Sequence, residues 1–145
     1  MLRGRFGDTS GRPYMEGHVL LPRLGWSGNV SFIFDAGADT SLLMPLDAQR
    51  MGIDYGMFED EETTLGIGGA SENFIEGAYL AFVNDEALYG YEIELHICKP
   101  AEELMTVPSL LGRDIIDQWR VTYDKSASEL LAEVISFDAQ EKLED

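Results

Sequence analysis

The stretch FIFDAGADTS, Phe32 to Ser41, places one carboxylate directly after an apolar run and inside a turn of very small residues. Upstream of that carboxylate, Asp35, apolar residues recur at every second position, which is typical of a strand with one buried face. A charge at the end of such a strand is costly to bury unless other groups satisfy or share it. Asp35 is therefore predicted either to cap a turn, by accepting N–H bonds from Gly37 and Ala38, or to take part in chemistry.

The overall charge of the chain excludes one large class of partners. Its 145 residues include 10 Lys+Arg against 27 Asp+Glu, which gives a formal net charge of -17 at pH 7. Such a chain repels a phosphate backbone, so we expect no nucleic-acid partner. The acidic runs at 59–62 and 141–145 lack the alternating oxygen-ligand spacing of a calcium loop and are predicted to be solvated.

Cysteine content and hydropathy predict a cytoplasmic protein. Cys98 is the only cysteine, so no intrachain disulfide can form and nothing indicates an oxidising compartment. The first residues are polar and glycine-rich rather than an apolar signal, and no apolar run approaches the roughly 20 residues that span a bilayer. We therefore expect no membrane partner.

Apolar residues recur mainly with period two, which predicts an all-β, mainly antiparallel chain with two short helices. Hairpins are expected from residues 18–22 with 29–35, from 63–65 with 72–83, and from 120–124 with 129–135, and a further strand at 88–98. One helix is expected between Pro45 and Gly52. The stretch 109–119 is expected to be a short strand entering a second helix, with Ile115, Ile116 and Trp119 on one side.

The chain is expected to form one domain. A chain of this length can bury a core, yet it is small enough to gain from a partner. Residues 14–136 are predicted to be the domain, preceded by a flexible N-terminal tail at 1–13 and followed by an acidic C-terminal tail at 137–145.

Three motifs occur in one order along the chain: DAGADTS at 35–41, LGIGGA at 65–70 and LLGRDII at 110–116. They resemble the active-site loop, the glycine-rich flap tip and the apolar-apolar-Gly-Arg segment of the retropepsin-like aspartic proteases. Residues 12–25 and 121–134 also resemble the terminal hairpins of the single-domain, cellular, non-retroviral members. This resemblance implies a closed acid-protease barrel that acts as a homodimer, with no cofactor and no metal.

The resemblance implies that the chain is an aspartic endopeptidase with Asp35 as its catalytic residue. One carboxylate takes a proton from water while a second, protonated one donates to the carbonyl oxygen of the peptide. Because the chain supplies one such residue, Asp35 of a second copy completes the dyad. The substrate is a peptide or protein that binds in an extended form. Gly37 and Ala38 keep the loop slim, and Asp39 faces the peptide backbone or holds the loop.

Two further parts follow from the resemblance. Gly66, Ile67, Gly68 and Gly69 form the tip of a flap that closes over the peptide. A phosphate-binding loop is the alternative for these glycines, but the following Lys-Ser/Thr is missing. Arg113 is expected to pair with Asp39 and support the loop, the alternative being an exposed arginine that contributes little.

Ala36 departs from the family pattern, in which Thr or Ser reaches across the two-fold axis with its hydroxyl. Two symmetric hydrogen bonds are lost, each worth about 0.5–1.5 kcal/mol. The alternative function is therefore a catalytically impaired, protease-like module for peptide binding or dimerisation. A domain that awaits a different partner chain is a third possibility.

His96 and Cys98 share one face of an expected strand, but two ligands do not make a zinc site, and His18 is the only other histidine. No metal is expected. The methionines are interpreted as core filler rather than cofactor ligands, at positions 44, 51, 57 and 105.

Overall fold

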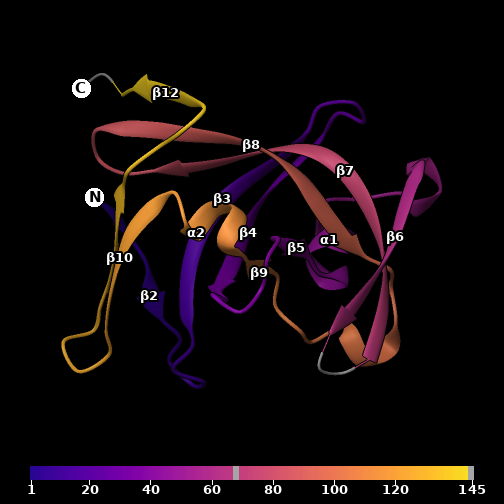
Figure 1. Ribbon diagram of the computed structural model, residues 1–145, viewed down its shortest axis with the longest axis horizontal. Coiled ribbons are helices and arrows are strands. Elements are labelled where there is room, and N and C mark those ends of the chain that lie inside the picture. Colours follow the sequence, from indigo (N-terminus) through magenta and orange to yellow (C-terminus); the bar gives the residue numbers. More distant parts are fainter. Residues whose placement is uncertain (67–68, 144–145) are drawn as a thin grey trace.

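The computed structural model describes residues 1–66 and 69–143, and it describes side chains outside 64–71. The chain folds mainly into strands (Figure 1). Two hairpins dominate: β3 (Pro13–Leu21) with β4 (Trp26–Phe34), and β7 (Gly69–Val83) with β8 (Ala87–Cys98). The expected hairpin of β3 with β4 is confirmed, and β8 matches the further strand expected at 88–98. In both pairs the consecutive strands run antiparallel.

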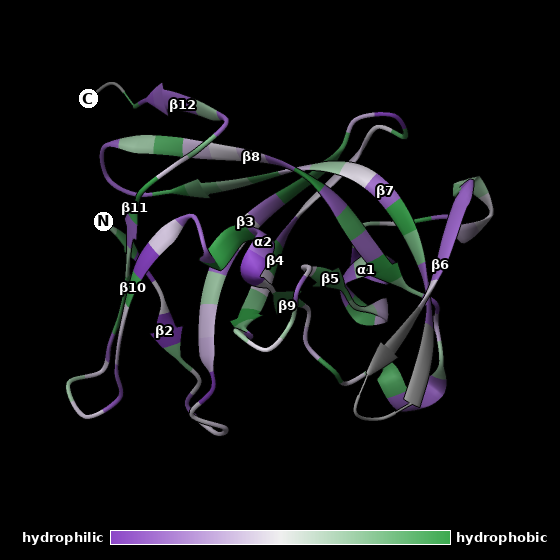
Figure 2. Cartoon of the chain, viewed as in Figure 1, coloured by the Kyte–Doolittle hydropathy of each residue, from purple (hydrophilic) through white to green (hydrophobic). Residues whose placement is uncertain are grey.

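Short strands close the main sheet into a barrel. The ring runs through β8, β5 (Leu42–Leu43), β9 (Leu110–Leu111), β4, β3 and β7, which pairs again with β8. Two of the pairings are parallel, β4 with β9 and β5 with β8. β6 (Asp60–Gly66) extends from β7 as a hairpin arm, and its hydrophilic start is visible in Figure 2. The closed, mainly antiparallel barrel predicted from the sequence is confirmed.

A smaller sheet lies beside the barrel. It contains β10 (Trp119–Asp124), β11 (Glu129–Val134) and β1 (Leu2–Arg3). β2 (Arg5–Phe6) pairs with β3, and β12 (Ala139–Lys142) pairs with β8.

These pairings differ from the tails expected at residues 1–13 and 137–145. Leu2 is only 1% exposed and lies opposite Ala132 in the small sheet. Composition indicated tails because these segments are polar or glycine-rich. Backbone groups, however, can pair with a free strand edge whatever side chains they carry.

Apolar residues of the strands fill the barrel. Phe32, Leu80, Tyr91 and Leu95 are at most 1% exposed. The Trp119 ring meets Phe82 edge-on with ring centroids 4.9 Å apart, and its Nε1–H donates to the Tyr91 hydroxyl at 2.7 Å. The core therefore satisfies the polar atom of its largest side chain.

The helices are short, as expected. α1 (Pro45–Arg50) begins with Pro45, and Gly52 follows it with a φ of 72°. α2 (Arg113–Ile116) buries Ile115 completely. The 3-10 turns η1 (Tyr55–Met57) and η2 (Glu102–Leu104) complete the chain, and no described helix is long and apolar enough to cross a membrane.

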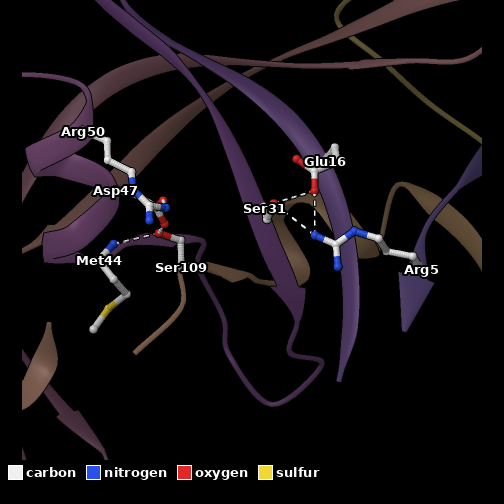
Figure 3. A network of polar contacts seen from close by, with 7 residues as sticks. All are labelled: Arg5, Glu16, Ser31, Met44, Asp47, Arg50 and Ser109. Atoms are coloured by element: carbon white, nitrogen blue, oxygen red, sulfur yellow. Dashed lines mark hydrogen bonds and ion pairs between the residues drawn. The ribbon is translucent and has the colours of Figure 1, made fainter. Parts of the chain in front are cut away.

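A buried serine, Ser109, connects α1 to β9. Met44, at the N-terminal cap of α1, offers no side-chain bond of its own. Instead, the Met44 N–H donates to Ser109 Oγ at 2.9 Å, and that hydroxyl donates to Asp47 Oδ2 at 2.7 Å (Figure 3). Ser109 is 0% exposed and directly precedes β9. This contact therefore sets the position of β9 against the helix.

Replacing Ser109→Ala is expected to lower the free energy of unfolding by about 1–3 kcal/mol, because it leaves the Met44 N–H and Asp47 without their buried partner. Urea denaturation measures the change. Ser126→Ala is the matched control, since Ser126 Oγ donates to Asp124 at 2.6 Å but in an exposed turn. Equal losses in the two variants would contradict the prediction.

Candidate active site

Asp35 is the first residue after β4, and the parallel pairing of β4 with β9 holds its backbone. Phe34 lies opposite Leu111 in this pairing. One residue further on, the Asp35 N–H donates to the Leu111 carbonyl at 2.9 Å. The Asp35 side chain is half-buried. Strand pairing therefore brings a carboxylate to the edge of the core while its backbone stays bonded.

A tight turn follows Asp35. The Gly37 N–H donates to Asp35 Oδ1 at 3.0 Å, which is one of the two bonds expected for a capping role. The Ala38 N–H donates instead to the Asp35 carbonyl oxygen, at 3.1 Å. Within the described part of the chain Oδ2 accepts no bond, so this oxygen can meet a proton, a water or a second carboxylate. Capping and chemistry are compatible at this residue.

The tip of the turn faces outward. Ala36 and Gly37 are exposed, and Ala38 is half-buried. None of the three carries a side chain larger than a methyl group. Residues 36–38 therefore present little more than backbone next to Asp35, and their role in admitting a peptide stays a prediction.

The second half of the loop is hydrogen-bonded to residues 112–114. The Arg113 N–H donates to the Ala38 carbonyl at 2.9 Å, and the Gly112 N–H donates to Ser41 Oγ at 3.0 Å. Ser41 donates twice to the Asp114 carboxylate, through its N–H at 2.9 Å and its hydroxyl at 2.7 Å. The loop is thus bonded to the N-terminal end of α2 at both Ala38 and Ser41.

Arg113 forms an ion pair with Asp39, the contact that the resemblance implied. Both side chains are open to solvent, Arg113 at 47% and Asp39 at 82% exposure. Exposed pairs of this kind contribute about 0.2–1 kcal/mol at most sites. The pair exists, but its role as the support of the loop stays a prediction.

The expected flap corresponds to the β6–β7 hairpin. The two strands pair as far as Gly66 opposite Gly69, and Ile67 and Gly68 lie outside the described residues. Lower on the hairpin, Lys99 Nζ bridges Glu61 of β6 at 3.1 Å and Glu72 of β7 at 3.3 Å. Both strands of the hairpin are thus tied to Lys99, the residue that follows β8. Its action as a flap stays a prediction.

His96 and Cys98 are both buried, and burial raises the pKa of the Cys98 thiol. A neutral thiol is a poor metal ligand, because the thiolate is the form that binds. Among the described residues no three His, Cys, Asp or Glu side chains gather as metal ligands would. Of the four methionines interpreted as core filler, Met44 is buried, Met51 packs against the core and Met105 is half-buried. The interpretation is wrong for Met57, which is 51% exposed.

Three residues of the site were not among the sequence predictions: Ser41, Gly112 and Asp114. Their contacts join segments about 70 positions apart, which no local pattern reveals. Gly112 carried a signal, since it sits between an apolar pair and a helix. A Cβ on Gly112 would lie 2.5 Å from the Thr40 carbonyl carbon and 2.6 Å from its oxygen.

Gly112→Ala is expected to lower the melting temperature and the free energy of unfolding by about 1–3 kcal/mol, because backbone atoms of Thr40 must move to admit the methyl group. Calorimetry of the variant measures both quantities. Gly77→Ala is the control, since a Cβ there meets nothing within 4 Å. If Gly112→Ala melts like Gly77→Ala, the close approach of the loop to α2 is not required.

The sequence matches no known family model and no curated protein. Among solved structures, the chain is similar to a retropepsin-like aspartic protease from Rickettsia conorii. The two share 20% sequence identity, and the match covers 99% of this chain and 92% of that chain with a TM-score of 0.57. The three motifs, the parallel strand pair beneath Asp35 and this likeness agree: the chain has the fold of the retropepsin-like aspartic proteases.

Proposed function

We propose that the chain is an aspartic endopeptidase that hydrolyses extended, partly apolar peptides. The observation that carries the proposal is the position and the hydrogen bonding of Asp35. It directly follows a barrel strand in the retropepsin-like fold, its backbone and Oδ1 are hydrogen-bonded, and its loop is held against α2. Preorganised carboxylates of this kind can act on a substrate without first rearranging.

The chemistry requires a pair of carboxylates. Two carboxylates about 3 Å apart share one proton, so one can activate water while the other donates to the peptide carbonyl. Each chain supplies one catalytic carboxylate, Asp35. The proposed enzyme is therefore a homodimer in which both copies of Asp35 meet at the two-fold axis. The exposed tip at Ala36 and Gly37 leaves room for this contact.

The other proposed parts follow the family pattern. The β6–β7 hairpin closes over the peptide as a flap, and Asp39 and the loop at 36–38 bind the peptide backbone. Arg113 supports the loop through Asp39. The expected partners are a second copy of the chain and a peptide or protein substrate, and the expected location is the cytoplasm. The reaction uses no cofactor and no metal.

Ala36 favours a second candidate function. Without a hydroxyl at this position, the loops of two copies cannot bond to each other as the family pattern has it. A dimer with a misplaced dyad would bind peptides without cleaving them, since small misplacements of catalytic groups cost large rate factors. The second candidate is therefore a peptide-binding or dimerisation module without turnover.

Asp35→Asn is expected to abolish cleavage of a diverse peptide pool between about pH 4 and 7, because the amide can neither share the proton nor activate water. Mass spectrometry reads the products.

Asp54→Asn is the matched control. Asp54 Oδ1 accepts from the Gly56 N–H at 3.0 Å, the same geometry as Asp35 with Gly37, but at the start of η1. This variant should cleave like the parent. A parent that captures peptides without products supports the binding module, and an Asp35→Asn protein that cleaves normally would falsify the enzyme.

Ala36→Thr is expected to tighten the homodimer, because it restores two hydrogen bonds worth about 1–3 kcal/mol together, or about 5- to 150-fold in the dissociation constant. Sedimentation across a concentration series measures the change. Ala36→Val controls for size, since valine has the shape of threonine without its hydroxyl. Equal dimerisation of the Thr and Val variants contradicts the hydrogen-bond explanation, and a chain that stays monomeric in every variant favours a different partner.

A further inference from the structure

Two buried serines, Ser41 and Ser109, each accept a hydrogen bond from a backbone N–H close to the other serine in the sequence. Ser41 accepts from the N–H of Gly112, three residues after Ser109. Ser109 accepts from the N–H of Met44, three residues after Ser41. Both serines are 0% exposed, and each precedes a two-residue strand of the sequence Leu-Leu. The two strands pair with each other, so the exchange is nearly symmetric.

Each serine hydroxyl also donates to an aspartate in the first turn of a helix. Ser41 donates to Asp114 of α2 at 2.7 Å, and Ser109 donates to Asp47 of α1 at 2.7 Å. The chemistry of the two contacts is therefore the same. Their surroundings differ, because Ser41 ends the loop that begins at Asp35, whereas Ser109 lies outside that loop.

The loop has two fixed ends. At its start, the Asp35 N–H is bonded to Leu111. At its end, Ser41 is bonded to Gly112 and Asp114, and α2 is anchored because Ile115 is fully buried. Without the side-chain contacts of Ser41 and Asp114, the loop would be held by one exposed ion pair and by three backbone bonds. These run from the Asp35 N–H to Leu111, from the Arg113 N–H to Ala38 and from the His96 N–H to Ser41.

That ion pair is the weaker constraint. Arg113 and Asp39 are 47% and 82% exposed, so water and salt screen their attraction. The hydroxyl of Ser41 is shielded from water, and of its two partners Gly112 is buried and Asp114 is half-buried. Hydrogen bonds to a carboxylate are also stronger than those between neutral groups.

We propose that Ser41 and Asp114 are positioning residues that hold the loop of Asp35 in place, and that the Arg113–Asp39 ion pair is secondary to them. The catalytic part of this inference rests on the proposed function. The part that concerns the loop itself does not, and it has a readout that needs no activity.

Amide hydrogen exchange in the folded protein tests the loop directly. The useful N–H groups are those of Asp35, Ala38 and Arg113, because their own hydrogen bonds involve neither the Ser41 nor the Asp114 side chain. In Ser41→Ala and Asp114→Ala these amides are expected to exchange at least about tenfold faster than in the parent. The amide of Ala132, in the small sheet, should not change.

Three controls separate positioning from general destabilisation. Ser109→Ala removes the same kind of contact elsewhere and should change the loop amides less than about threefold. Asp39→Ala removes the ion pair and should also leave them near the parent rates. Asp114→Asn should fall between Asp114→Ala and the parent, since its amide oxygen still accepts from the Ser41 N–H and its NH₂ can donate to the hydroxyl.

Peptide cleavage supplies the second readout. Ser41→Ala and Asp114→Ala are expected to lower kcat at least about tenfold with KM within about threefold of the parent, because the dyad is misplaced while the peptide still binds. Asp117→Ala, an exposed carboxylate at the end of the same helix, should retain parental kcat.

The two proposals fail in different ways. If the parent cleaves and the Ser41 and Asp114 variants cleave equally well, the positioning role is overturned and the protease stands. If the parent does not cleave, the protease fails and the exchange rates alone decide the positioning role. Loop amides that keep parental rates in both variants, or that respond as strongly to Ser109→Ala or Asp39→Ala, overturn it.

Discussion

The parallel pairing of β4 with β9 is the constraint on which the rest of the structure depends. Parallel strands cannot be joined by a tight turn, so a long crossover must connect them. Here the crossover contains α1, β5 and the whole β6–β7–β8 unit. The barrel closes when β9, at the end of this crossover, pairs with β4 and β5. Only after that closure does Leu111 lie beside Asp35. The position of one carboxylate thus depends on contacts distributed over most of the chain, which is why it can be held rigidly.

Two buried serines near this pairing find their hydrogen-bond partners inside the protein. Ser41 and Ser109 each bond to a helix aspartate and to a backbone N–H from the other half. Neither helix has a side-chain cap of its own at the residue before it, Met44 or Gly112. The serine hydroxyls accept the hydrogen bonds of the Met44 and Gly112 N–H groups instead. One pair of residues therefore satisfies the helix ends and fixes both short strands.

The sequence predicted the parts of the fold that local patterns control. The long hairpins follow from period-two alternation, and α1 follows from Pro45 and Gly52. β5 and β9 have two residues each, too few for any period. The serine contacts join distant segments, so no local rule reveals them, although the repeated Ser-Leu-Leu at 41–43 and 109–111 was a visible signal. Leu2 was missed because the few apolar residues of this polar segment show no period. The flap and the catalytic role of Asp35 stay predictions from resemblance.

Ala36 gains a different meaning once the loop is seen to be held from within its own chain. In the family pattern, the hydroxyl at this position joins two copies. In this chain the bonds from Asp35, Ala38 and Ser41 to the segment 111–114 form before any partner is needed. A loop that is already ordered loses little further freedom when two copies meet, and such preorganisation favours binding. On the proposed function, the missing hydroxyl therefore weakens association of the copies more than it disturbs the shape of each active-site half.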